Sequence, residues 1–153
     1  MYTYKATLDR VVDGDTVDLN IDLGFDVWVK KRVRLEHVDT PEKRTTDPLE
    51  KHFGFMASDF VLDKLMGAEQ MVVKTTLDGS TDKYGRVLGV IWVDHALTSV
   101  NDQLIEKYLA VKYEGQNKSD IEAAHINNMR YLVESNEVKL TSDLLELYNQ
   151  LPK

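Results

Sequence analysis

Two short acidic motifs hold the residues best suited to chemistry. In R-V-V-D-G-D-T-V, Asp13 and Asp15 flank a glycine, and in V-R-L-E-H-V-D-T-P-E, Asp39 and Glu42 flank a Thr-Pro pair. Each motif alone is typical of a turn, because Asp-Gly pairs form hairpins and aspartate forms Asx turns without any ligand. Together, carboxylates near strand ends offer the oxygen ligands that Ca²⁺ and Mg²⁺ prefer.

Basic residues accompany these motifs. Arg34 lies in the second acidic motif, and T-D-K-Y-G-R places Lys83, Tyr84 and Arg86 before a later strand pattern. The planar guanidinium group of arginine matches phosphate oxygens bidentately. A metal site, a carboxylate base and paired arginines are the groups that metal-assisted hydrolysis of a phosphodiester requires. The three motifs in combination therefore indicate phosphoryl chemistry.

The composition is that of an ordinary globular domain. The chain has 153 residues, 42% hydrophobic and 29% charged, which predicts one domain over residues 1–153. It has no cysteine, which excludes disulfides, thiolate catalysis and cysteine-based zinc sites. No apolar run approaches the roughly 18 residues of a membrane span, and no signal peptide pattern precedes the first strand. We therefore expect a cytoplasmic protein.

The net charge of −7 is distributed unevenly. The overall charge argues against broad attraction to nucleic acid or to an anionic membrane. One segment, residues 27–44, is an exception because its basic residues outnumber Glu36, Asp39 and Glu42 by three. This basic stripe consists of Lys30, Lys31, Arg32, Arg34, Lys43 and Arg44.

Hydrophobic periodicity predicts five strands. Alternating apolar and polar residues indicate a meander with one buried face over residues 2–8, 17–23 and 25–35. Two shorter apolar runs indicate further strands at 71–73 and 87–93.

Capping sequences predict the helices between and after these strands. Asp47-Pro48 begins a helix that Gly67 ends, and Ser99 and Ser119 begin two more. A short last helix is expected over residues 141–151. This order predicts an α+β fold with a mainly β core, a five-stranded OB-fold barrel flanked by three helices with a C-terminal helical extension.

The three motifs, in this order and spacing, resemble the staphylococcal nuclease (thermonuclease) family. The resemblance covers residues 8–124 approximately and leaves out the final segment, 141–153, which we expect to cover the barrel. It implies an OB-type barrel with three helices and a Ca²⁺-dependent enzyme. Such an enzyme hydrolyses DNA and RNA by in-line attack of water at phosphorus and leaves 3′-phosphates. Action inside a phage-infected or bacterial cell would fit the missing signal peptide.

The resemblance also implies a metal site. Asp15 and Asp39 would be carboxylate ligands of Ca²⁺, and the backbone carbonyl of Thr40 would be a third ligand. Asp13 would lie close to this site without direct ligation.

The remaining roles concern the attacking water and the substrate. By resemblance, Glu42 would hold or deprotonate the water, while Arg34 and Arg86 would clamp the scissile phosphate. Lys83 and Tyr84 would contact the neighbouring phosphate. Tyr113, after L-A-V-K, would match a tyrosine that packs near the nucleotide.

Two other classes of protein share this kind of fold. The first alternative is a catalytically inactive OB-type module that binds nucleic acid or a protein partner. Such modules are expected to lose clamp arginines or carboxylates, and all of these are retained here, which favours the enzyme. The second is a purely structural barrel, which would leave the combined motifs unexplained.

The remaining features concern substrate binding and the histidine and tryptophan residues. Because the net charge is negative, we expect salt-sensitive binding of single-stranded DNA or RNA by a monomer. His37 lies beside the second motif and is interpreted as a packing or solvent-facing residue rather than a metal ligand. His52, His95 and His125 show no ligand spacing and are assigned no role. Trp28 is expected to pack in the barrel.

Overall fold

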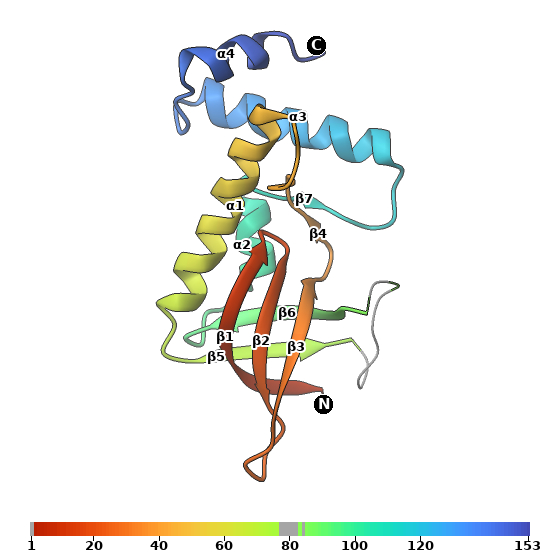
Figure 1. The fold of residues 1–153 in the computed structure, drawn as a ribbon, viewed down its shortest axis with the longest axis vertical. Coiled ribbons are helices and arrows are strands. Elements are labelled where there is room, and N and C mark those ends of the chain that lie inside the picture. Colours follow the sequence, from red (N-terminus) through yellow and green to blue (C-terminus); the bar gives the residue numbers. More distant parts are fainter. Residues whose placement is uncertain (1, 77–82, 84) are drawn as a thin grey trace.

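The protein is built around a closed barrel of five strands (Figure 1). The computed structural model describes residues 2–76, 83 and 85–153. The strands follow one another in the order β1-β2-β3-β6-β5, which confirms the predicted OB-fold barrel. The β3–β6 pair is parallel and the other pairs are antiparallel. The barrel strands are β1 (Thr3–Asp13), β2 (Thr16–Asp22), β3 (Trp28–Leu35), β5 (Met71–Thr75) and β6 (Val87–Val93).

Alternation of side chains fills the barrel. On β2, Val17, Leu19 and Ile21 are buried, and Val17 is paired with Val33 of β3. Because successive side chains of a strand point to opposite faces, every second residue contributes to one hydrophobic core. The strand pattern in the sequence therefore reports the barrel interior directly.

Helices and a small second sheet surround one end of the barrel. Figure 1 shows α1 running beside the barrel, α3 crossing beyond its end, and α4 lying on the far side of α3. Two short strands, β4 (Val38–Asp39) and β7 (Val111–Lys112), pair with each other and form a sheet that the sequence did not predict. The helices are α1 (Pro48–Met66), α2 (Val100–Glu106), α3 (Lys118–Glu134) and α4 (Ser142–Asn149). In the described part of the chain, no helix has the length and apolarity to cross a membrane.

A second hydrophobic core lies between the helices. Leu144, Leu147, Tyr148 and Leu151 of the C-terminal segment are partly buried against it. This corrects the expectation that the C-terminal segment covers the barrel, since it packs on α1 and α3 instead. The second core consists of Leu49, Phe53, Met129, Leu132 and Val138.

Several predicted boundaries agree with the structure and others do not. Asp47 caps α1 through its side chain, and Gly67 ends the helix, as predicted. α3 begins two residues earlier than expected, because Asn117 rather than Ser119 accepts the hydrogen bond from Asp120 N–H.

The turn between β2 and β3 is also longer than predicted. Phe25 and Asp26 have positive φ angles of 56° and 61°, so the turn includes the first residues of the strand predicted over 25–35, and β3 begins at Trp28. Phe25 is fully exposed, and Trp28, expected inside the barrel, is half exposed at the start of β3. Alternation alone does not reveal where a sheet ends, because exposed apolar residues fit the same pattern.

Candidate functional site

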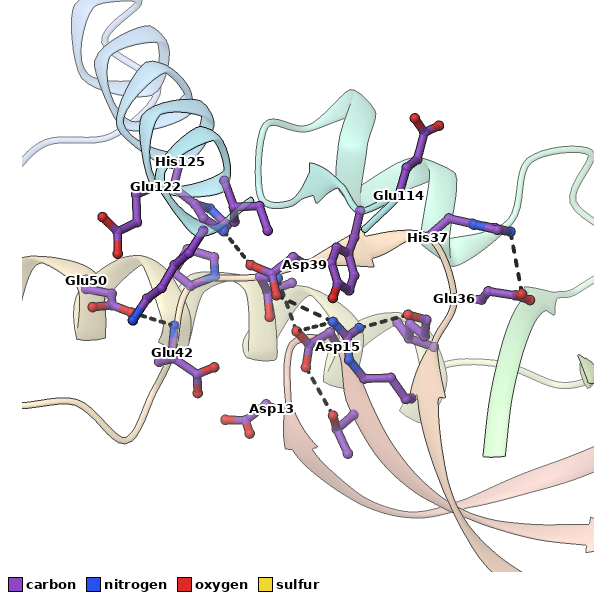
Figure 2. A pocket seen from close by; sticks show the side chains of 18 of the residues that line it. Asp13, Asp15, Glu36, His37, Asp39, Glu42, Glu50, Glu114, Glu122 and His125 are labelled. Atoms are coloured by element: carbon purple, nitrogen blue, oxygen red, sulfur yellow. Dashed lines mark hydrogen bonds and ion pairs between the residues drawn. The ribbon is translucent and has the colours of Figure 1, made fainter. Parts of the chain in front are cut away.

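The predicted site residues surround one large cleft. The cleft has a volume of about 1290 Å³ and lies where the β1–β2 turn and the end of β3 meet β4, α1 and α3. All predicted site residues within the described ranges line it, and Figure 2 shows several of their side chains converging there. These residues are Asp13, Asp15, Arg34, Asp39, Thr40, Glu42, Lys83, Arg86 and Tyr113.

Gly14 brings the first acidic motif against the second. A Cβ atom at Gly14 would lie 2.7 Å from Ala57 Cβ on α1 and 3.0 Å from Thr40 Oγ1. Only glycine allows this approach, because real Cβ atoms do not come within 3.0 Å of other atoms. Asp15 is buried there, and its Oδ2 accepts a hydrogen bond of 3.2 Å from the backbone N–H of Thr40. The hairpin turn therefore also places a carboxylate beside the Thr40 backbone.

Arg34 lies at the centre of the site. Its Nη2 atom is 3.5 Å from Asp15 Oδ2 and 3.4 Å from Asp39 Oδ1. Its Nη1 atom donates to the backbone carbonyls of Leu35 (2.8 Å) and Val38 (2.7 Å). Since the side chain is only 11% exposed, these contacts hold the guanidinium group in one orientation between the two carboxylates.

Asp39 is held by a residue to which the sequence assigned no role. Its Oδ2 atom lies 2.7 Å from Nε2 of His125 on α3. Glu122, one helical turn earlier, also lines the cleft. His125, to which the sequence assigned no role, therefore contacts one of the predicted metal ligands. His37 is 71% exposed and pairs with Glu36, which agrees with its interpretation as a solvent-facing residue.

Glu42 is carried on a loop that packs against α1. A Cβ atom at Gly54 of α1 would lie 2.5 Å from the carbonyl oxygen of Glu42, so the loop backbone touches the helix directly. The backbone N–H of Glu42 donates to Oε1 of Glu50 (3.3 Å). The pKa of the Glu42 carboxyl is raised by partial removal from water and then by the negative charges of Asp15 and Asp13.

The carboxyl of Asp13 also lies in surroundings that disfavour its ionised form. Burial raises the pKa of its carboxyl, and the charge of Asp15 raises it further. Its Oδ1 atom is buried and has no hydrogen-bond partner among the described residues. The ionised form of Asp13 is therefore poorly compensated in the folded protein.

The carboxylate oxygens of the site are of the kind that a hard cation prefers as ligands. The carboxylates of Asp15 and Asp39 converge, since a single Arg34 nitrogen lies near both. The buried Oδ1 of Asp13 and the raised pKa of Glu42 report negative charge that a cation would balance. Among the described residues, no group of three or more histidine, aspartate or glutamate side chains is arranged to hold a metal. A cation here would therefore need carbonyl and water oxygens as well, which Ca²⁺ accepts.

The residues predicted to contact substrate that the structure describes also line the cleft. Arg86 is half-buried, while Lys83 is exposed at the rim. The ring of Tyr113 is 5.9 Å from Cζ of Arg34, and the Tyr113 side chain is largely accessible. Tyr84 lies outside the described residues.

Three of the six residues of the basic stripe are paired with acidic side chains. Arg32 makes two hydrogen bonds to Asp18, of 2.8 and 3.1 Å, and Lys30 lies 3.4 Å from Asp9. Arg34 is paired as described above. Acidic residues of β1 and β2 therefore balance Lys30 and Arg32, whereas Lys43 donates to the Val12 carbonyl and the Ser58 hydroxyl instead of to a carboxylate.

An OB-fold barrel whose end carries an acidic cleft with a central arginine defines the class of this protein. The chain belongs to the family described as staphylococcal nuclease homologues, whose sequence pattern matches residues 32–139. The matched residues begin and end later in the chain than residues 8–124, which carried the resemblance. It confirms the family expected from the three motifs.

Several curated proteins are similar to this chain. Endonuclease YhcR of Bacillus subtilis is 32% identical over 115 residues, covering 72% of this chain and 9% of that protein. Protein ParB of Escherichia coli is 32% identical over 111 residues, covering 72% and 54%. The SPbeta prophage-derived endonuclease YokF of B. subtilis is 31% identical over 128 residues, covering 78% and 40%. The chain thus spans from about a tenth to about half of the length of these relatives.

Proposed function

We propose that the protein is a Ca²⁺-dependent nuclease that hydrolyses DNA and RNA by in-line attack of water at phosphorus, leaving 3′-phosphates. The observation that carries the proposal is the convergence of Asp15, Arg34, Asp39 and Glu42 in one cleft. Family membership and the relatives named as endonucleases support the same reaction class.

The cation would be held by Asp15, Asp39 and the carbonyl of Thr40. When bound, it supplies positive charge that polarises a phosphate oxygen and stabilises the developing negative charge. The hydrogen bond from the Thr40 backbone N–H to the buried Asp15 carboxylate holds these two residues together before substrate arrives. This preorganisation is favourable because the proposed ligands of the cation do not have to be ordered during the reaction.

Glu42 takes the proton from the attacking water. Its raised pKa suits this task, because a carboxylate whose pKa lies nearer to neutral is a stronger base than an ordinary glutamate. Its contact with α1 at Gly54 holds the loop backbone in place. Glu42 therefore combines a fixed position with increased basicity.

Arg34 and Arg86 bind the phosphate. In the structure, Nη2 of Arg34 balances the charges of Asp15 and Asp39. With a cation held by these carboxylates, Nη2 of Arg34 would be available to donate to a phosphate oxygen. Lys83 and Tyr113, on the rim and wall of the cleft, would contact the adjoining nucleotide.

The substrate is proposed to be single-stranded, and binding is proposed to be sensitive to salt. The net charge of −7 and the pairing of half of the basic stripe with acidic residues weaken the attraction of a long duplex. Affinity then depends on phosphate contacts inside the cleft. A cleavage rate that stays flat from low to high salt would contradict this part of the proposal.

The test is cleavage of single- and double-stranded DNA with Ca²⁺, with a chelator, and by a Glu42→Gln variant. Loss of a positioned general base is expected to reduce kcat by about 10²–10⁴-fold. The matched control is Glu106→Gln, because Glu106 is exposed on α2 and does not line the cleft. Absence of cleavage by the folded wild-type protein with any divalent metal would instead favour the inactive binding module.

A further inference from the structure

Each oxygen of the Asp39 carboxylate contacts a side chain from a different element of the fold. Oδ1 lies 3.4 Å from Nη2 of Arg34 on β3, and Oδ2 lies 2.7 Å from Nε2 of His125 on α3. His125 is 86 positions away in sequence, and its side chain is only 13% exposed. Figure 2 shows the His125 ring reaching from α3 to Asp39 across the wall of the cleft. This contact is short, largely shielded from water, and has no counterpart among the three motifs.

Contacts other than the one with the Asp39 side chain also set the position of His125. Three residues later on α3, the Asn128 side chain donates to the carbonyl of Ala110 (3.1 Å). Ala110 directly precedes β7, and Val111 of β7 is paired with Asp39 itself. Asp39 therefore pairs with β7, the residue before β7 accepts a hydrogen bond from α3, and α3 contacts Asp39 through His125. The second core anchors the same helix through buried Met129 and Leu132.

The chemistry of the pair assigns a direction to the hydrogen bond. An ionised carboxylate can only accept, so Nε2 of His125 carries the proton and donates it to Oδ2. A donor fixed in this way limits rotation of the Asp39 side chain and leaves Oδ1 facing Nη2 of Arg34. Groups that hydrogen-bond a metal-ligating carboxylate orient it and commonly change metal affinity when removed.

We infer that His125 is a positioning residue that holds the Asp39 carboxylate in the orientation required to bind the cation. The inference rests on the proposed function, because it assigns His125 a part in building the same metal site. It extends the site from the three motifs to α3.

The experiment is calorimetric titration of the full chain with Ca²⁺ in the absence of nucleic acid. His125→Leu removes the donor and is expected to weaken Ca²⁺ binding by about 10–100-fold. His125→Gln can place an amide N–H near the position of Nε2 and is expected to retain most of the affinity. His95→Gln is the matched control, because His95 is exposed on the loop after β6, away from the cleft.

Thermal unfolding of the same variants separates positioning from simple support of the fold. Rescue of Ca²⁺ affinity by His125→Gln, relative to His125→Leu, supports positioning. Wild-type affinity in His125→Leu would overturn the inference while leaving the proposed function intact. Equal loss of affinity in both variants, together with equal loss of thermal stability, would also overturn it. A folded wild-type protein that binds no Ca²⁺ would reject the proposed metal site and this inference with it.

Discussion

Replacing Gly54 by alanine tests the placement of Glu42 without changing any side chain that is proposed to react. In an ordinary helix, this exchange stabilises the protein by about 1 kcal/mol, because alanine loses less backbone entropy on folding. Here the new Cβ would lie 2.5 Å from the carbonyl oxygen of Glu42, 2.7 Å from its carbonyl carbon and 2.9 Å from Lys43 N. All three atoms belong to backbone, so no side chain can rotate away to relieve the overlap.

The size of the displacement follows from these distances. The Glu42 carbonyl oxygen must retreat from 2.5 Å to at least 3.0 Å, and the loop that carries the carboxylate moves with it. Displacements approaching 1 Å at a reacting group can cost about 10²-fold in rate. We therefore expect kcat to fall by about 10–100-fold. Ca²⁺ affinity should change little, because Glu42 is not among the proposed ligands.

The assay is steady-state cleavage of single-stranded DNA, combined with Ca²⁺ titration and thermal unfolding. Gly67→Ala serves as the control, because its Cβ would lie 3.1 Å from Asp63 O, a distance that a small shift can accommodate. Overpacking is expected to cost Gly54→Ala about 1–3 kcal/mol of stability. Undiminished cleavage by the Gly54→Ala protein would refute the reasoning, since Glu42 would then need no such contact to act.

Two further predictions concern stability. Asp13→Asn should raise the midpoint of thermal unfolding by a few degrees at neutral pH in the absence of Ca²⁺, whereas Asp59→Asn, an exposed control, should not. The sign follows from the raised pKa of Asp13: its ionised form is disfavoured by folding, so the advantage of asparagine grows as pH rises through the folded-state pKa. The advantage should vanish below the ordinary value of 3.8, where the wild-type carboxyl is neutral in both states, and an advantage that persisted there would contradict this cause. Removal of residues 141–153 should lower the free energy of unfolding, measured in urea, by about 2–4 kcal/mol, because four partly buried side chains leave the second core. Unchanged stability of this truncated chain would mean that α4 contributes no packing energy.

Much of the barrel was predictable because its signals are local. The alternation along β2 and the Asp47 and Gly67 boundaries of α1 depend on residues a few positions apart. Such patterns failed where exposure departs from periodicity, as at Phe25, which continues the alternation but lies in a turn. The prediction failed again at the start of α3, because Asn117 and Ser119 are both residue types that cap helices and Asn117 is the actual cap.

The sequence by itself determined the barrel, the family and the set of residues suited to chemistry, since each depends on residue types and short spacings. Only the tertiary structure decided that Arg34 lies between Asp15 and Asp39, and that Lys30 and Arg32 of the basic stripe are paired with acidic residues of β1 and β2. It also decided that His125 holds Asp39. The physical reason is that these contacts depend on strand register and on the packing of α3 through the second core. No local pattern encodes them, because the partners of each contact are brought together only when the chain has folded.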